Sequence, residues 1–220
     1  MIVPAPTRLT IVVADAPVGD LQPFRDLLDR ADLIVSADGG ARHLLALDRL
    51  PQLAVGDFDS LEPELLTRLE AAGVEIRKHP VHKDETDLEL ALLAAIERGA
   101  TCIYVLAALG GRPDQHLANL QLLTHPALAD ADVRLLHRNW EVFVVRRSAS
   151  IFGTPGDTVS LLPMTDEVHG IVTEGLYYPL RHETLRLGPA RGVSNVMEAD
   201  TARVWLRAGL LLVVHTLGRA

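Results

Sequence analysis

Strand-like and helix-like segments alternate through the first 136 residues, and this alternation restricts the chain to a small set of folds. Apolar runs of strand length are expected at 9–14, 33–35, 53–55, 74–76, 102–109 and 133–136. Helical spacing of apolar residues is expected near 24–28, 41–50, 63–72, 86–98 and 114–123. Strands separated by helices of this length predict an α/β fold, with a mostly parallel sheet covered on both faces.

The pattern changes after residue 138, where short strand-like segments follow one another without a convincing helix. They lie at 141–145, 157–162, 170–173, 202–206 and 210–214. Arg207-Ala208-Gly209 predicts a hairpin turn between the last two. We therefore expect an α/β domain over residues 1–138 and a smaller all-β, sandwich-like domain over 139–220.

Composition excludes several classes of protein. A formal net charge of -8 argues against a nucleic-acid partner, because such proteins usually carry a basic stripe. The apolar stretch 208–214 is shorter than the roughly 20 residues of a membrane span, and the first residues lack the basic start of a secretion signal. Cys102 is the single cysteine and suits a buried, inert thiol. The sequence predicts a cytoplasmic protein with no membrane partner.

Acidic and glycine-rich turns follow four of the predicted strands of the first domain. They are Asp38-Gly39-Gly40, Gly56-Asp57-Phe58-Asp59-Ser60, Lys83-Asp84-Glu85-Thr86-Asp87 and Gly110-Gly111-Arg112-Pro113-Asp114. Open α/β sheets bind their ligands at the carboxyl ends of the strands, so these turns are candidates for one site.

Each turn has a chemical and a structural interpretation. Asp57 and Asp59 can share a hard cation, and Lys83 and Arg112 can bind phosphate oxygens, whereas Gly39 and Gly40 let backbone amides approach a ligand.

Structurally, the same residues suit ordinary turns and helix caps, and Thr86 with Glu89 has the spacing of a capping box. Four such turns at one edge of a sheet favour a site for a divalent metal and a polyphosphate. The chain lacks the P-loop and dinucleotide fingerprints, and His79 and His82 have no partner pair for a zinc site.

The ordered motifs resemble those of the thiamine pyrophosphokinase family. They are Asp38-Gly39-Gly40, Gly56-Asp57-Phe58-Asp59-Ser60, Thr86-Asp87-Leu88-Glu89, Gly110-Gly111-Arg112-Pro113-Asp114 with Asn119, and Gly192-Val193-Ser194-Asn195. The resemblance covers both predicted domains. It implies transfer of pyrophosphate from ATP to thiamine with Mg²⁺, giving thiamine diphosphate and AMP, in a homodimer whose active sites are shared between chains.

The same resemblance implies roles for individual residues. Asp57, Asp59 and Asp87 match the acidic residues that hold magnesium and the phosphates, with Asp84 close by. The nucleotide-binding turn of the family is matched by Gly111, Arg112 and Asp114. Ser194 and Asn195 match the pair that contacts the pyrimidine of thiamine.

The chain also departs from the family pattern. Gln115 stands where the family commonly has histidine, so that histidine's role does not transfer. The first strand ends in Asp15-Ala16-Pro17, without the expected asparagine or glycine. Trp205 suits either a platform for the thiamine ring or a core residue of a strand. Two other functions remain open at this point: a magnesium-dependent phosphatase that uses Asp57 and Asp59, and a non-catalytic sensor of nucleotide or thiamine.

Overall fold

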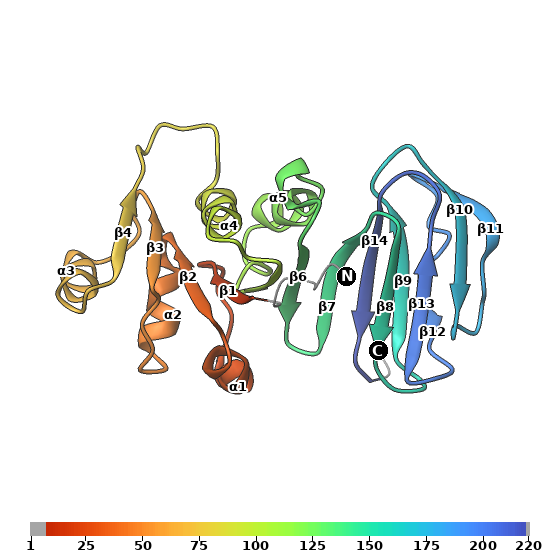
Figure 1. Cartoon of the computed structure of the whole chain (residues 1–220), viewed down its shortest axis with the longest axis horizontal. Helices are drawn as coiled ribbons and strands as arrows, with labels where there is room; N and C mark the ends of the chain where they lie inside the picture. The colour runs from red at the N-terminus through yellow and green to blue at the C-terminus, as the bar shows by residue number, and fades with distance from the viewer. Residues whose placement is uncertain (1–7, 219–220) are drawn as a thin grey trace, which may run out of the picture. The chain divides into compact units, whose positions relative to one another are not determined.

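Buried aliphatic runs form the parallel strands of the first of two units, which divide between Leu135 and Leu136. The computed structural model describes residues 8–218. The strands are β1 (Leu9–Val13), β2 (Leu33–Ala37), β3 (Leu53–Gly56), β4 (Glu75–Lys78), β5 (Cys102–Leu106) and β6 (Asp132–His137). Their spatial order is β6-β5-β1-β2-β3-β4, with every neighbouring pair parallel (Figure 1).

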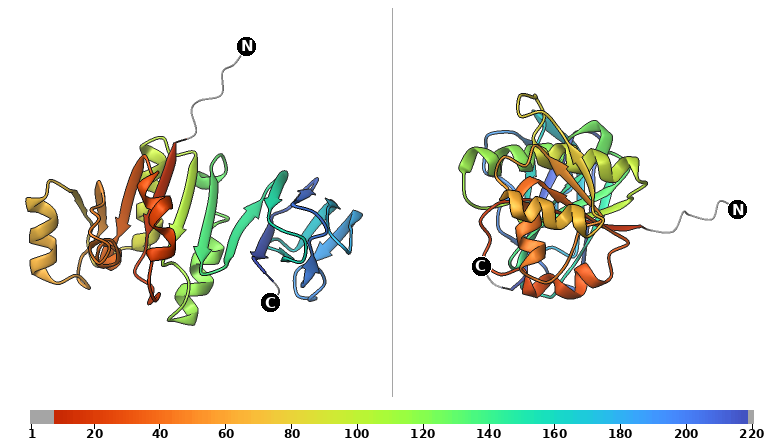
Figure 2. Two further views of the ribbon diagram at one scale, coloured as in Figure 1. Left: turned by 90° about the horizontal axis from the view of Figure 1, so that it is seen from below. Right: turned by 90° about the vertical axis from the view of Figure 1, so that its left-hand side faces the viewer.

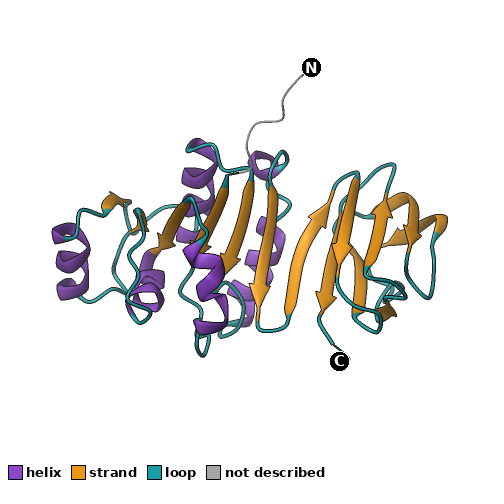
Figure 3. Cartoon of the chain, turned by 60° about the horizontal axis from the view of Figure 1, so that its bottom comes forward, coloured by secondary structure: helices purple, strands orange, loops and turns teal. Residues whose placement is uncertain are grey.

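Helices cover both faces of this parallel sheet, as the sequence predicts (Figures 2 and 3). They are α1 (Arg25–Asp29), α2 (Ala41–Leu45), α3 (Pro63–Ala71), α4 (Asp87–Glu97) and α5 (Pro113–Leu122), with short 3₁₀ helices η1 (Gln22–Phe24), η2 (Asp38–Gly40) and η3 (Pro126–Leu128). In Figure 1, α1 and α2 lie on one face and α4 and α5 on the other. Among residues 8–218, no helix combines the length and apolarity needed to cross a bilayer.

Helix α2 is shorter than the helix predicted over 41–50, because the chain forms a left-handed C-terminal cap. Asp48 has φ +56°, and the N–H of Arg49 donates to the carbonyl of Leu44 at 3.0 Å. The N–H of Asp48 donates to the carbonyl of Leu45 at 3.1 Å, which completes a Schellman motif. The cap ends the helix before Pro51, a residue that disfavours helical conformation in its predecessor.

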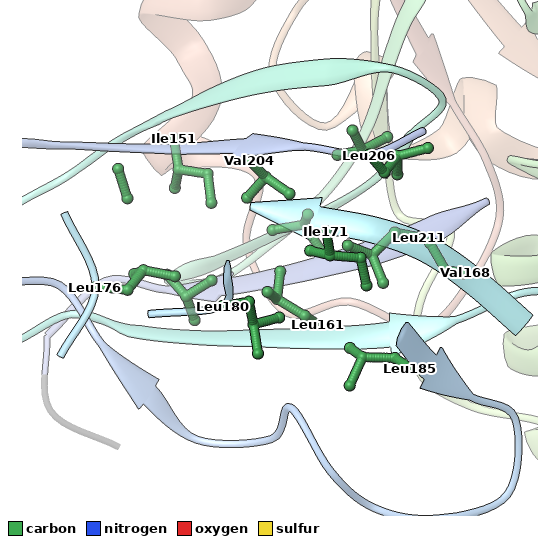
Figure 4. Packing of buried hydrophobic residues seen from close by; sticks show 14 of the residues in the cluster. Ile151, Leu161, Val168, Ile171, Leu176, Leu180, Leu185, Val204, Leu206 and Leu211 are labelled. Carbon is green, nitrogen blue, oxygen red and sulfur yellow. The ribbon is translucent and has the colours of Figure 1, made fainter. Parts of the chain in front are cut away.

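The second unit is a sandwich of two antiparallel sheets. One has the order β12-β9-β14-β7 and the other β11-β10-β13-β8. The strands are β7 (Trp140–Val145), β8 (Ser148–Phe152), β9 (Thr158–Pro163), β10 (Glu167–Glu174), β11 (Arg181–Arg186), β12 (Asn195–Val196), β13 (Thr201–Trp205) and β14 (Leu211–Thr216). Alternate residues of both sheets, including Leu161 and Ile171, point inward and fill one apolar core (Figure 4).

The predicted hairpin at 207–209 is wrong. β13 pairs with β8 and β10, whereas β14 pairs with β7 and β9, so the segment joins the two sheets. It is bonded to β10: Arg207 N–H donates to the His169 carbonyl, and His169 N–H donates to the Ala208 carbonyl, both at 2.9 Å. Gly209, with φ +97°, lies so close to Glu167 that an added Cβ would be 2.7 Å from its carbonyl oxygen.

A buried ionic cluster lies within the second unit. The His215 ring, on β14, is 1% exposed, with Nδ1 3.2 Å from Glu141 Oε1 and Nε2 3.1 Å from Asp157 Oδ2. Asp157 also accepts from the amides of Thr154 and Gly218, at 2.9 and 2.7 Å. Two carboxylates facing both ring nitrogens favour the doubly protonated imidazolium, which donates to each.

The titration of His215 links this cluster to stability. Burial lowers the pKa of His215, but the hydrogen bonds to Glu141 and Asp157 outweigh burial and raise it above the usual value near 6.5. The folded protein therefore holds this proton more tightly than the unfolded chain. The stabilisation is complete below a pH of about 6.5 and is lost as the pH rises through the folded-state pKa.

We expect His215→Gln to lower the free energy of unfolding by about 3 kcal/mol or more near pH 6, because the buried carboxylate of Asp157 loses the positive charge of the ring. The loss should shrink as the pH rises, since the wild type then gives up the same proton. Denaturant titrations between pH 6 and 10 measure both effects. His82→Gln, at an exposed histidine, is the control. A pH-independent loss in His215→Gln would contradict the charged assignment.

Candidate active site

The carboxyl ends of the parallel strands line a cavity of about 460 Å³. The strand order reverses between β1 and β5, so the connections that leave them diverge and open a crevice there. The cavity is lined by Ala14, Asp15, Ala16, Pro17, Ala37, Asp38, Asp59, Ser60, Thr86, Asp87, Leu88, Ala107, Ala108, Gly110, Arg112, Gln115 and Asn119. All four predicted turns therefore contribute to one site.

The two glycines after β2 allow the backbone to pass close to the end of β1. A Cβ added to Gly40 would lie 2.1 Å from the carbonyl oxygen of Val13, and one added to Gly39 would lie 2.4 Å from Asp15 Oδ2. The sequence predicts that these glycines let backbone amides approach a ligand closely. In the structure the close approach is made by the chain itself, and its effect is to hold Asp38 at the cavity wall.

Three carboxylates from three different turns converge beside the cavity. Asp38 follows β2, Asp57 follows β3 and Asp87 is the first residue of α4. Each offers a carboxylate oxygen within 4.8 Å of the other two. Asp38 Oδ1 is buried without a hydrogen-bond partner, so this oxygen remains available to a ligand. Asp87 Oδ1 also accepts no hydrogen bond, but it is ion-paired with a neighbouring lysine.

Lys83 is the cation within this carboxylate group. Its Nζ lies 2.7 Å from Asp57 Oδ2 and 3.1 Å from Asp87 Oδ1. The Lys83 hydrogen bond lowers the pKa of Asp57 against the opposing effect of burial. Burial raises the pKa of Asp87, and Lys83 does not fully offset that effect. One lysine thus compensates part of the negative charge of the group.

Asp59 lies outside the converging carboxylates. Its backbone N–H donates to Asp57 Oδ1 at 3.2 Å, while its own carboxylate is exposed and lines the cavity. The charge of Asp57 is the largest cause that raises its pKa, followed by loss of hydration and then the charge of Asp38. The metal ligands predicted from the sequence were Asp57, Asp59 and Asp87, so the group in the structure differs by having Asp38 in place of Asp59.

The Gly110-Gly111-Arg112 turn places a guanidinium at the cavity. Arg112 pairs with Asp114 through two contacts, Nη2 to Oδ2 at 2.5 Å and Nε to Oδ1 at 3.1 Å, in an exposed position. Gly111 has φ +70°, and a Cβ there would be 2.8 Å from Pro17 Cδ. The absence of a side chain at Gly111 therefore lets the loop after β5 pack against the loop after β1, across the crevice.

Sequence reasoning missed Arg42 and the hydroxyl of Ser60. Arg42, on α2, pairs with Asp15 Oδ2 at 2.6 Å and donates to the Ser60 carbonyl at 2.5 Å, so it joins the loops that follow β1 and β3. Ser60 Oγ donates to Asp38 Oδ2. The positions of Asp15 and Ser60 after strand ends could have indicated that they belong to the site. The position of Arg42 inside a helix gave no such indication.

Two residues predicted at the start of α4 have different positions. Thr86 caps the helix by accepting from the N–H of Glu89 at 3.2 Å, and it also lines the cavity. Asp84 is exposed and is absent from the cavity lining.

The predicted thiamine residues belong to the second unit. The Asn195 side chain is buried, accepts from the N–H groups of Tyr178 and Val196 at 3.0 and 2.9 Å, and donates to the Tyr178 carbonyl at 2.8 Å. It therefore fixes the loop that follows Leu176. Ser194 is exposed with φ +59°, and Trp205 is half-buried beside Arg203 in a shallow groove on the outer face of β13.

Comparison with known families matches both units. The model of the thiamin pyrophosphokinase catalytic domain matches residues 24–135, and the model of the thiamin pyrophosphokinase vitamin B1 binding domain matches residues 144–211. The chain belongs to the thiamin pyrophosphokinase family.

Relatives within this family are similar over nearly the whole chain. The thiamine pyrophosphokinase of Bacillus subtilis is 26% identical over 215 residues, which cover 93% of this chain and 97% of the relative. Its crystal structure superposes with a TM-score of 0.82 over 95% of this chain and 99% of that chain. A family member from Enterococcus faecalis is 28% identical, with a TM-score of 0.81 over 96% and 100% of the two chains.

The carboxylate group suits a small divalent cation. Carboxylate oxygens are the ligands that Mg²⁺ prefers, and oxygens on opposite sides of an octahedral Mg²⁺ are about 4.2 Å apart. The oxygens of Asp38, Asp57 and Asp87 all lie within 4.8 Å of one another, so one ion can contact all three. Asp87 at a helix N-terminus adds a carboxylate at a favourable position of the helix dipole.

We expect Asp38→Asn to weaken binding of a divalent ion more than Asp59→Asn does. Loss of an outer-shell partner already costs about 10- to 100-fold in metal affinity, and a direct ligand should cost at least as much. Titration with Mn²⁺, followed by electron paramagnetic resonance, measures the affinity, with Asp84→Asn as the exposed control. A larger loss in Asp59→Asn would restore the ligand set predicted from the sequence.

Proposed function

We propose that this chain transfers the pyrophosphoryl group of ATP to the hydroxyl of thiamine, giving thiamine diphosphate and AMP. The observation that carries the proposal is the match of the two family models to the two units, combined with the acidic cavity in the unit that matches the catalytic domain. In the proposal residues 1–138 bind nucleotide and metal and residues 139–220 bind thiamine, in the cytoplasm.

Mg²⁺ is the metal we propose for the carboxylates of Asp38, Asp57 and Asp87, with Asp59 beside them. When bound, it supplies positive charge that neutralises the phosphates and the charge that develops in phosphoryl transfer. The carboxylate of Asp38 is held in position by a bond within the chain, since the hydroxyl of Ser60 donates to it. Such preorganisation is what phosphoryl transfer requires of a protein, which mainly orients groups and compensates charge.

Arg112 is proposed to bind the polyphosphate. Its guanidinium is exposed and is paired with Asp114, and a phosphate presents the same bidentate oxygens as that carboxylate. An arriving phosphate would therefore exchange with Asp114 for the two N–H donors. Gln115, which lines the cavity, can hydrogen-bond to a ligand but cannot transfer a proton near neutral pH as histidine can.

Ser194 and Asn195 are proposed to contact thiamine and to complete an active site of the partner chain in a homodimer. The support is the family resemblance of Gly192-Val193-Ser194-Asn195 and the vitamin B1 binding domain match over 144–211. Because the Asn195 amide is used to fix its own loop, its proposed role toward thiamine is to shape the site as well as to contact the ring.

The products decide between the proposed transfer and the two alternatives. Incubation with ATP, Mg²⁺ and thiamine should give AMP and thiamine diphosphate in equal amounts, measured by chromatography. ADP with thiamine monophosphate would contradict pyrophosphoryl transfer. Inorganic phosphate with an aspartyl-phosphate intermediate would instead favour the phosphatase, and tight binding of ligands without turnover would favour the sensor.

Subunit mixing tests the shared site. Inactive Asp87→Asn chains mixed with inactive Asn195→Ala chains should regain about a quarter of normal activity, because about half the dimers are hybrids and each has one intact site of two. Circular dichroism checks that Asn195→Ala remains folded. Asp87→Asn mixed with Asp57→Asn is the matched control and should give no rescue, since both lesions lie in the first unit. Exchanged hybrids without activity would exclude a shared site.

A further inference from the structure

Lys83 is held inside the carboxylate group by three oxygens. Besides Asp57 Oδ2 at 2.7 Å and Asp87 Oδ1 at 3.1 Å, its Nζ donates to the carbonyl of Pro80 at 3.1 Å. The contacts with Asp57 and Pro80 are hydrogen bonds, whereas the contact with Asp87 Oδ1 is an ion pair without hydrogen-bond geometry. The side chains of Lys83 and Asp57 are 10% and 9% exposed, which shields their interaction from solvent.

The position of this ammonium conflicts with that of a divalent ion. Two of the three carboxylates in the proposed metal group already share Lys83, while Asp38 does not contact it among the described residues. A lysine charge and a divalent charge attached to the same carboxylates would repel each other at short range, where burial strengthens the repulsion. Binding of the metal therefore favours a change of partner for Lys83.

The choice of lysine suits such a change. The chain has 21 basic residues, and only Lys78 and Lys83 among them are lysines. Arginine forms rigid bidentate pairs with carboxylates, whereas the lysine ammonium is a compact point charge on a flexible stem. A lysine can fill the space between two carboxylates and move by rotation of its side chain.

We propose that Lys83 is an exchangeable counter-ion: it neutralises Asp57 and Asp87 while the divalent ion is absent, competes with that ion for them, and transfers to the polyphosphate when metal and nucleotide bind together. This inference rests on the proposed metal and nucleotide site. Its consequence is that one residue has two opposite effects. Lys83 weakens binding of the free metal ion and strengthens binding of the metal–nucleotide complex.

The test uses binding of Mn²⁺ and of Mn²⁺ with a non-hydrolysable ATP analogue, measured by calorimetry without turnover. Lys83→Met and Lys83→Gln should bind Mn²⁺ alone about tenfold or more tightly than the wild type, because the competing charge is gone. The same variants should bind the metal–nucleotide complex about tenfold or more weakly, since a charge-assisted contact to phosphate is lost.

Thermal melting gives a second readout. Without divalent ions, Lys83→Met should melt at a lower temperature than the wild type, because two partly buried carboxylates lose their counter-ion. Added Mn²⁺ should raise its melting temperature by more than it raises that of the wild type. Lys78→Met removes the same charge from an exposed site on β4 and should match the wild type in every measurement.

The sign of each change decides the outcome. Unchanged or weaker binding of Mn²⁺ alone in both neutral variants would overturn the proposal, because Lys83 would then be a fixed support for the carboxylates. Unchanged or tighter binding of the metal–nucleotide complex would overturn the transfer to phosphate. Absence of Mn²⁺ binding in the wild type and both variants would overturn the proposal at its base. These results do not depend on thiamine, so they are separable from the product test of the proposed reaction.

Discussion

Like charges held close together are the constraint on which the candidate site depends. Asp38 and Asp57 directly follow the adjacent strands β2 and β3, and α4 begins with Asp87, so the fold itself brings three carboxylates together. Repulsion among them must be offset if the unit is to remain folded. Lys83 and Ser60 supply part of the compensation, and the remaining negative charge is the physical basis of the proposed metal site.

Close backbone packing keeps those charges in place. Gly40 passes against the end of β1, Gly111 brings the β5 loop to Pro17, and Arg42 joins the loops after β1 and β3. These contacts surround the crevice where the strand order reverses. A side chain at either glycine would separate the loops, and the three carboxylates would then no longer converge.

The ends of the strands could be predicted from the sequence, but the direction of each side chain could not. Apolar runs located the parallel strands, and the residues that follow them were correctly expected to gather in one place. Asp59 lies apart from the converging carboxylates for a local reason: Phe58 has φ +61° and is buried with Leu61 and Leu69, so the chain turns between Asp57 and Asp59. A left-handed conformation at an aromatic residue is uncommon and has no signal in the spacing of residues.

Strand pairing in the second unit was beyond local patterns for a related reason. β11 carries charged residues on its exposed side, so it lacks the apolar run of a typical strand, and β13 and β14 looked like neighbours although they belong to different sheets. Which strands pair is decided by the shared core of the sandwich. That information is distributed over the whole unit, whereas a hairpin signal covers only a few residues.

The place of β14 has a consequence for the order in which the chain folds. It lies between β7 and β9, with Leu211 paired to Val145 on one side and to Pro163 on the other. Its sheet cannot close until this late segment has been synthesised, whereas every strand of the parallel sheet precedes residue 138. During translation the first unit can therefore become ordered while β7 and β9 still lack their shared partner strand. Their unpaired backbone groups are then open to pairing with a wrong strand.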